Sequence, residues 1–317
     1  SKSKKIYWCQ IRLIMDFKSK IVLIAGPTAS GKSKFAIKLA KKIHGEIINA
    51  DSMQVYKELK ILSARPYVKD CQNIKHHLYG FQNVKHNFST GDWLKLALKK
   101  ILEIKRRKKI PILVGGTGLY FKAILEGLVK IPNIPIKFRS KIRQLHKNLG
   151  QKIFYKKLLD LDPKSKNRIN STDSQRSIRA YEVKKFTNKS IQDWYQNTYP
   201  VYEDKDFFKI YMNFPRDQLI SKINSRTEKM IKMGAIREVE KFVKLKVKKD
   251  KSVNKAIGIS EIKEYLNDEK KLNEITEKIS IKTRQYAKRQ STWARGNMRS
   301  WFQLEPLEIK KFLKKIK

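Results

Sequence analysis

The residues best suited to chemistry lie in IVLIAGPTASGKS, residues 21–33. Gly26, Gly31, Lys32 and Ser33 match the spacing G-x-x-x-x-G-K-[ST], which is typical of a phosphate-binding loop. In such a loop backbone N–H groups and a helix N-terminus face an anion, the lysine adds a point charge, and the serine hydroxyl can hold Mg²⁺. The pattern predicts a bound polyphosphate, but it does not say which one.

Asp51 and Thr117 are two further candidates, because both follow predicted strands. Short apolar, β-branched runs that predict buried strands occupy residues 21–25, 46–50 and 110–114. Amphipathic patterns that predict helices occupy residues 35–43, 93–106 and the stretch from 119 onward. In open parallel α/β sheets ligands bind outside the carboxyl ends of the strands. We therefore expect the phosphate loop, Asp51 and Thr117 to share one crevice.

Residues 131–205 lack strand-like runs and consist of helical, lysine-rich segments, which predicts an inserted all-α domain. Within it Arg176 and Arg179 are three residues apart and would share one helical face. A strand pattern returns at 207–213, and the chain from Arg216 to its end is predicted to be helical. The fold class expected is α/β, a parallel sheet core with flanking helices and this all-α insert.

The stretch 283–295, TRQYAKRQSTWAR, combines basic and aromatic side chains on a predicted helix. Arg284, Lys288 and Arg295 would lie on about one face with Arg289 adjacent, and aromatic residues are interleaved. Such a pattern suits RNA backbone contacts and base stacking. It is also compatible with an ordinary solvated helix whose aromatics belong to the core.

Other segments are less informative. Residues 53–66 are predicted to form a loop or a short helix. His76 and His77 are adjacent, so their side chains point apart and make a poor metal pair. We favour a structural role for them over a substrate-facing one.

Composition excludes several classes of protein. The chain of 317 residues carries a net charge of +44, and no apolar run approaches the roughly 20 residues of a membrane span. It has only two cysteines, Cys9 and Cys71, which excludes a disulfide framework and fits a reducing, cytoplasmic setting. Lysines number 57 and arginines 16, so an arginine indicates a site that needs a planar fork of donors. Residues 1–17 are predicted to be a disordered basic extension.

Several motifs, taken together and in order, resemble the tRNA dimethylallyltransferase family, in its bacterial type. They are GPTASGKS, ADSMQVY, PILVGGTGLYFKAILEGL, DSQRSIRAYEV and TRQYAKRQSTWARG, and they span about residues 21–300. The resemblance implies a P-loop-type core at 18–130 and 206–317, with the insert at 131–205 binding tRNA. It implies transfer of dimethylallyl from dimethylallyl diphosphate to N6 of adenosine 37, in tRNAs that read codons beginning with U. The expected enzyme is a cytoplasmic monomer that uses Mg²⁺.

The resemblance also assigns residues. Asp51 would be the general base, with Lys32, Thr117 and Arg226 as further catalytic groups and Ser33 on Mg²⁺. The diphosphate would be held by Gly26, Pro27, Thr28, Ala29, Ser30, Gly31, Lys32 and Ser33. With the basic helix face added, the expected tRNA contacts are Asp51, Ser52, Met53, Gln54, Thr117, Arg139, Gln175, Arg176, Ser177, Ile178, Arg179, Lys255, Arg284, Lys288 and Arg289.

Three segments depart from the family pattern. Residues 60–66 read KILSARP where the family usually has DIGTAKP, residues 76–80 read HHLYG where HHLID is common, and residues 257–259 read IGI where IGY is common. These changes put the contacts of the first loop in question, although they remove no proposed catalytic group. Two other functions explain the phosphate loop, namely a small-molecule kinase and an RNA-binding NTPase without transferase activity. A kinase leaves the arginine-bearing insert unexplained, and either alternative would consume ATP.

Overall fold

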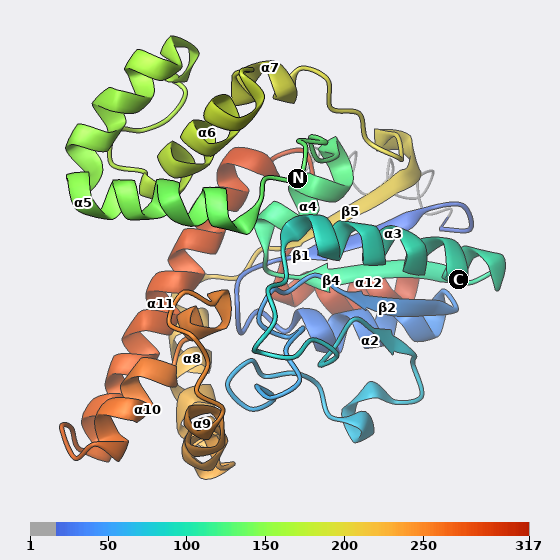
Figure 1. The fold of residues 1–317 in the computed structure, drawn as a ribbon. Coiled ribbons are helices and arrows are strands. Elements are labelled where there is room, and N and C mark those ends of the chain that lie inside the picture. The colour runs from blue at the N-terminus through green and yellow to red at the C-terminus, as the bar shows by residue number, and fades with distance from the viewer. Residues whose placement is uncertain (1–16, 317) are drawn as a thin grey trace. The chain divides into compact units, whose positions relative to one another are not determined.

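The computed structural model describes residues 17–316, so the expectation of a disordered extension falls outside the described residues, except for Phe17. The chain divides into two compact units (Figure 1). One runs to Ala123 and resumes at Tyr202, and the other is Ile124–Val201. The second unit begins and ends a few residues earlier than the predicted 131–205.

The first unit contains a six-stranded parallel sheet of order β3-β2-β4-β1-β5-β6. Its strands are β1 (Ile21–Ala25), β2 (Gly45–Asn49), β3 (His76–His77), β4 (Ile110–Gly115), β5 (Phe207–Met212) and β6 (Phe302–Leu304). Every residue of β1, β2 and β4 is buried. Near-continuous apolar runs are what a parallel sheet covered on both faces requires. The four predicted strands are thus confirmed to within one residue at each end.

Helices cover both faces of this sheet (Figure 1). The first unit contains α2 (Lys32–Lys42), α3 (Thr90–Arg106), α8 (Arg216–Lys232), α9 (Ala235–Lys244), α10 (Ile259–Leu266), α11 (Leu272–Asn297) and α12 (Ile309–Lys315). Helix α4 (Gly118–Glu126) begins in the first unit and ends in the second. On one face, Phe35 and Leu39 of α2 pack with Val22 and Ile24 of β1 in the largest core. Helix α3 packs against β2 and β4, and its Trp93 Nε1 donates to the Asn49 carbonyl at 2.8 Å.

A separate core joins the loop after β2 to α8–α11. Val55, Tyr56 and Leu59 pack there with Val239 of α9 and Ile279 of α11. Residues 53–66 form turns rather than a short helix. This core therefore fixes a loop without regular structure against the helices that flank the phosphate-binding site.

The expectation that the chain is helical from Arg216 to its end is wrong at one point. Strand β6 pairs in parallel with β5, with Ile210 opposite Phe302 and Met212 opposite Leu304. Three residues are too few to display a strand period, so the pattern alone does not separate them from a helix end.

The second unit is helical, as predicted. Its helices are α5 (Ile136–Leu161), α6 (Ser174–Thr187) and α7 (Ile191–Tyr195). Phe154 and Leu158 of α5 pack against Tyr181 of α6. Helix α5 is kinked at Gly150, whose φ is 71°. No helix within residues 17–316 is long and apolar enough to cross a membrane.

His77 has a structural partner, as favoured from the sequence. Its Nε2 lies 2.7 Å from Oε2 of Glu46, a carboxylate that is only 1% exposed. Arg107 donates to the same oxygen at 2.7 Å. Burial by itself would raise the pKa of Glu46, but the hydrogen bonds from Arg107 and His77 outweigh it and lower this pKa to about 2.

Candidate active site

The phosphate loop connects β1 to α2, as its sequence predicts. Gly31 has a φ of 81° and precedes the first residue of α2, so the loop N–H groups and the helix N-terminus lie together. The Lys32 ammonium donates to the Pro27 carbonyl at 2.7 Å, which holds it against the loop. Residues 26–31 form the loop, and Lys32 and Ser33 begin the helix, which is the geometry that an anion site needs.

Two distant helices are tied to this loop. Arg226 of α8 donates from Nη1 to Thr28 Oγ1 at 3.0 Å. Gln290 of α11 accepts from the Thr28 N–H at 2.8 Å and donates from Nε2 to the Gly116 carbonyl at 2.9 Å. Gln290 therefore links the phosphate loop to the turn after β4. It is absent from the predicted site residues, although it lies in the quoted TRQYAKRQSTWARG, because an uncharged amide carries no obvious chemical signal.

Asp51 lies at the carboxyl end of β2, as expected. Its N–H donates to Asn49 Oδ1 at 2.9 Å, and its Oδ1 accepts from the Met53 N–H at 2.9 Å. Thr117 joins the same turn, because its Oγ1 accepts from the Ser52 N–H at 2.9 Å. The bond from Met53 fixes the direction of the Asp51 carboxylate, and the other two fix the backbone that carries it.

Gly115 allows this close approach of the strand ends. A Cβ at Gly115 would lie 1.9 Å from the Ala50 carbonyl oxygen, so no other residue fits there without moving the backbone. The Thr117 N–H donates to that same oxygen at 3.2 Å. The expectation of one shared crevice is confirmed for the loop and Asp51, whereas Thr117 lines a smaller cavity beside it.

A cavity of about 740 Å³ opens above the loop. Among its lining residues are Thr28, Lys32, Ser33, Asp51, Asp70, Arg226 and Gln290. Burial lowers the pKa of Lys32 to about 8; the Asp51 carboxylate raises this pKa and the Arg226 charge lowers it further. Burial also lowers the pKa of Arg226, while Asp51 raises it. The two cations and the carboxylate therefore influence one another across a single cavity.

A smaller cavity of about 290 Å³ adjoins the first at Gln290, which lines both. Its lining residues include Ser52, Thr117, Tyr286, Arg289 and Trp293. The interleaved aromatics of the basic helix thus face a hollow next to Asp51. One cavity is lined by anion-binding groups, and the other offers aromatic surfaces on which a planar ring can stack.

The residues around Ser33 fit a Mg²⁺ ion shared with a substrate. Ser33 is exposed and lines the large cavity together with the Asp51 carboxylate. Within residues 17–316 no group of three histidines, cysteines or acids could hold a metal alone. Mg²⁺ is commonly held by one or two protein oxygens plus substrate phosphates, so this donor set is suitable.

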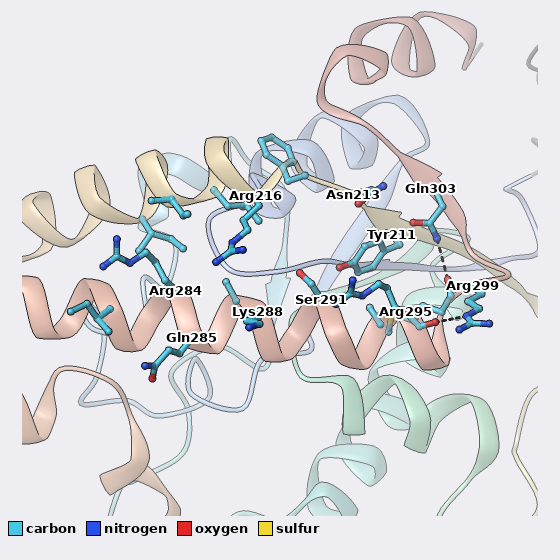
Figure 2. A pocket seen from close by; sticks show the side chains of 18 residues that line it. Tyr211, Asn213, Arg216, Arg284, Gln285, Lys288, Ser291, Arg295, Arg299 and Gln303 are labelled. Carbon is cyan, nitrogen blue, oxygen red and sulfur yellow. Dashed lines mark hydrogen bonds between the residues drawn. The ribbon is translucent and has the colours of Figure 1, made fainter. Parts of the chain in front are cut away.

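A third hollow, a groove of about 900 Å³, lies between α8 and α11 (Figure 2). Figure 2 shows Arg216, Arg284, Lys288, Arg295 and Arg299 along it. Among residues 17–316, those that line it include no acid, and its floor is apolar, with Leu219, Ile223 and Met298. The predicted shared face of Arg284, Lys288 and Arg295 is confirmed, whereas Arg289 points to the smaller cavity.

The predicted tRNA segment of α6 is divided by burial. Arg176 is 74% exposed and pairs with Asp173 at 3.2 Å. Ser177 is fully buried, and its hydroxyl accepts a hydrogen bond from Gln151 Nε2 at 3.1 Å. The expectation of direct tRNA contact at Ser177 is therefore wrong, because its hydroxyl faces the interior of the helical unit. Ile178 is half-buried and packs against the core of that unit.

The loop that departs from the family pattern is anchored to α9. The backbone N–H groups of Lys60, Ile61 and Leu62 all donate to the Glu238 carboxylate, at 2.8–2.9 Å. Arg65 then donates from Nη1 to the Tyr56 carbonyl at 3.0 Å. A Cβ at residue 80 would lie 1.6 Å from that Nη1, so Gly80 leaves room for the arginine. The departures at 60–66 and 76–80 are thus in contact, and together they give the loop a defined position.

The other predicted tRNA residues are dispersed over the first unit. Gln54 donates from Nε2 to the Ser63 carbonyl at 3.0 Å, and Met53 packs against the core beside the loop. Lys255 is exposed in the turn Ser252–Lys255. Of these, Gln54 lines the large cavity.

Comparison with known proteins identifies the family. Residues 54–297 match the model of the IPP transferase family. The tRNA dimethylallyltransferase of Pelagibacter ubique is 61% identical over 303 residues, which are 96% of this chain and 97% of that protein. A tRNA dimethylallyltransferase of Rhizobium etli is 42% identical, covering 89% and 96% of the two chains.

Solved structures agree with these sequences. The tRNA isopentenylpyrophosphate transferase of Bacillus halodurans superposes with a TM-score of 0.67 at 32% identity, covering 94% of this chain and 95% of its own. A eukaryotic dimethylallyltransferase that acts on tRNA gives 0.79 at 26% identity, with 90% and 74% covered. Both the sheet core and the activity named for the relatives match the expectations from the sequence.

Proposed function

The chain belongs to the IPP transferase family as a tRNA dimethylallyltransferase, and from this premise we propose its substrates, its catalytic groups and its product. The donor is dimethylallyl diphosphate and the acceptor is N6 of adenosine 37, in tRNAs that read codons beginning with U. The observation that carries the proposal is the pair of adjoining cavities, one with the phosphate loop and Asp51 and the other with Thr117 and aromatic side chains. An allylic diphosphate and an adenine can meet where they adjoin.

Asp51 acts as the general base. The exocyclic amine of adenine is a weak nucleophile, because its lone pair is delocalised into the ring. A carboxylate that accepts its proton during attack lowers the barrier. The hydrogen bonds from Met53 and through Asn49 hold Asp51 in one orientation, so little reorganisation is needed as the proton moves.

The phosphate loop stabilises the leaving group. As the C–O bond of the donor breaks, negative charge grows on the diphosphate oxygens. Loop N–H groups, Lys32 and Arg226 are fixed around that position before the reaction begins, and such preorganised donors usually supply the largest catalytic term. Ser33 would hold Mg²⁺, which would add positive charge beside the diphosphate oxygens when bound.

The adenine enters the smaller cavity after it leaves its stack, at a cost of roughly a few kcal/mol. Tyr286 and Trp293 offer replacement stacking there, and Thr117 with Ser52 gives polar atoms at the entrance. Arg289 lines the same cavity and is placed to contact the flanking phosphate.

The cationic groove between α8 and α11 binds the tRNA backbone. The lining residues that the structure describes are basic, polar or apolar, so phosphates are attracted and meet no repulsion from these residues. Arg284 and Lys288 act here. The remaining proposed tRNA contacts are Asp51, Met53, Gln54, Lys255, Arg139, Gln175, Arg176, Ile178 and Arg179.

The test is incubation of the purified protein with labelled dimethylallyl diphosphate and unmodified tRNA, followed by nucleoside analysis. We expect labelled N6-dimethylallyladenosine at position 37, formed without added ATP. An absolute requirement for ATP, or ATP consumption without tRNA, would instead support a kinase.

A further inference from the structure

Three arginines of the helical unit converge on one buried carboxylate. Glu182 of α6 is 1% exposed. Its Oε2 lies 3.2 Å from Arg139 Nε and 3.4 Å from Arg179 Nη1, and its Oε1 lies 3.7 Å from Arg143 Nε. Arg139 and Arg143 are one turn apart on α5, while Arg179 is one turn before Glu182 on α6. Helices α5 and α6 pack directly together (Figure 1).

This cluster differs from an ordinary buried ion pair in its balance of charge and exposure. The three arginine side chains are 39%, 51% and 39% exposed, so the carboxylate is inside and the guanidinium groups are at the surface. One negative charge meets three positive charges, which leaves a net charge of about +2 on the patch. A guanidinium has five N–H donors, and a carboxylate takes only one or two of them.

The use of arginine rather than lysine in this cluster also suits a phosphate ligand. Lysines outnumber arginines by 57 to 16 in this chain, yet all three partners of Glu182 are arginines. Lysine would supply the same charge, so the cluster selects for planar forks of donors. Such forks suit phosphate, because two parallel N–H groups can bind its oxygens while another holds the carboxylate.

We propose that Glu182 is a positioning residue that orients Arg139, Arg143 and Arg179 as one patch for tRNA phosphates, and that Arg143 itself contacts a phosphate. The inference rests on the proposed function, since it takes tRNA as the ligand. Glu182 cannot contact the ligand, because its carboxylate is buried beneath the arginines. It restricts the rotamers of the three arginine side chains before tRNA binds, so less side-chain entropy is lost on binding.

The Glu182→Gln substitution gives the sharpest test, because charge and orientation predict opposite results. The substitution raises the charge of the patch by one, so attraction alone would tighten tRNA binding. Lost orientation weakens it, by about threefold to tenfold, since each freed side chain must be immobilised again. We expect weaker binding in fluorescence anisotropy, a raised KM for tRNA, and an unchanged kcat and KM for dimethylallyl diphosphate. Tighter or unaltered binding by a folded variant would overturn the positioning role.

Arg143→Ala tests the phosphate contact without changing the buried Glu182 carboxylate. We expect tRNA affinity to fall about tenfold, and the slope of log affinity against log salt to fall by about one. Arg168→Ala is the matched control, because Arg168 is an exposed arginine of the same unit outside the cluster, and its slope should stay at the wild-type value. Arg143→Lys should recover the slope but only part of the affinity.

These binding measurements separate the inference from the proposed reaction. Equal slopes for Arg143→Ala and wild type would overturn the inference even if prenyl transfer is normal. Should Glu182→Gln fail to fold, as its melting curve would reveal, Arg143→Ala and Arg143→Lys still decide whether the patch binds phosphate. Absence of any prenyl product from the wild type, with tRNA bound and the slopes as expected, would refute the proposed reaction and leave the patch in place.

Discussion

Asp51 is the residue on which the proposed chemistry depends most. Asp51→Asn preserves shape and can still hydrogen-bond to the adenine amine, but it cannot accept the proton. Loss of a general base costs about 10²–10⁴ in rate. We expect kcat to fall by that factor while the affinity for dimethylallyl diphosphate holds, as single-turnover kinetics and calorimetry would measure.

The control for Asp51 is Asp70→Asn, which removes one negative charge from the rim of the same cavity. Its kcat should remain near the wild-type value. If Asp51 serves instead as a Mg²⁺ ligand, added Mg²⁺ should restore the Asn variant, because a weakened metal site recovers by mass action and a missing base does not. Near-normal turnover in Asp51→Asn would refute the base assignment.

Lys32 makes diphosphate binding dependent on pH. Burial lowers its pKa to about 8, so in the free enzyme the ammonium loses its charge as the pH rises above that value. A bound diphosphate favours the charged form and returns the pKa toward its ordinary value of 10.5. Binding at pH 8.5 should therefore take up roughly half a proton or more. Calorimetry in two buffers of different ionisation enthalpy measures this uptake.

Lys32→Arg is the matched variant, because a guanidinium remains protonated throughout this range. It should bind the donor without proton uptake. Equal uptake by both proteins would assign the proton to another group. A wild-type KM for the donor that stays constant from pH 7 to pH 10 would contradict the role of the Lys32 charge.

At the scale of elements, α11 contributes to the site through one amide. Gln290→Ala removes both hydrogen bonds that tie this helix to the phosphate loop and to Gly116. Misplacement of groups by about 1 Å can cost about 100-fold in rate. We expect kcat/KM for dimethylallyl diphosphate to fall by about 10–100-fold with the melting temperature little changed, as steady-state kinetics at saturating tRNA would measure.

Gln290→Glu separates the two bonds, because a carboxylate still accepts from the Thr28 N–H but cannot donate to the Gly116 carbonyl. It also adds a negative charge beside the diphosphate, so its KM for the donor should exceed that of the Ala variant. Thr276→Ala, at a half-buried position of α11 outside both cavities, serves as the control. Wild-type kinetics in Gln290→Ala would show that the link only accompanies the fold.

At the scale of the whole molecule, Glu46 couples β2 to β3 and to the end of α3. Glu46→Gln removes the carboxylate that Arg107, His77 and Lys109 share. Breaking a buried ion pair costs about 3–5 kcal/mol, and the partial exposure of Arg107 should reduce this to about 2–3 kcal/mol at pH 7. Denaturant unfolding followed by circular dichroism measures the difference.

The pH dependence of the free energy of unfolding tests whether the Glu46 ion pair causes this loss of stability. The pKa of Glu46 is lowered to about 2, so its contribution to the free energy of unfolding is complete above its ordinary value of 4.5 and is lost as the pH falls through 2. The difference in the free energy of unfolding between the wild type and Glu46→Gln should therefore shrink as the pH falls from 4.5 to 2. Glu103→Gln, which loses the surface pair with Lys100, should show little change at pH 7. If the free energies of unfolding of the wild type and Glu46→Gln differed by the same amount at every pH, the ion pair could not be the cause.

Features that depend only on neighbouring residues could be predicted from the sequence. The phosphate loop, the strands around it and the positions of Asp51 and Thr117 follow from short runs whose meaning is local. The sequence also separated the helical insert, because a change of period over some 70 residues needs no tertiary contact to be visible. The family followed from the order of several such motifs.

The tertiary structure alone decided which distant groups meet. Gln290 bonds to a residue 262 positions away, Ser177 turns inward to Gln151, and three arginines share Glu182. No local pattern encodes these contacts, because a helical period predicts which side chains share a face but not what that face packs against. The three residues of β6 likewise form a strand only because β5 offers an edge, and its hydrogen bonds come from a segment some 90 residues earlier.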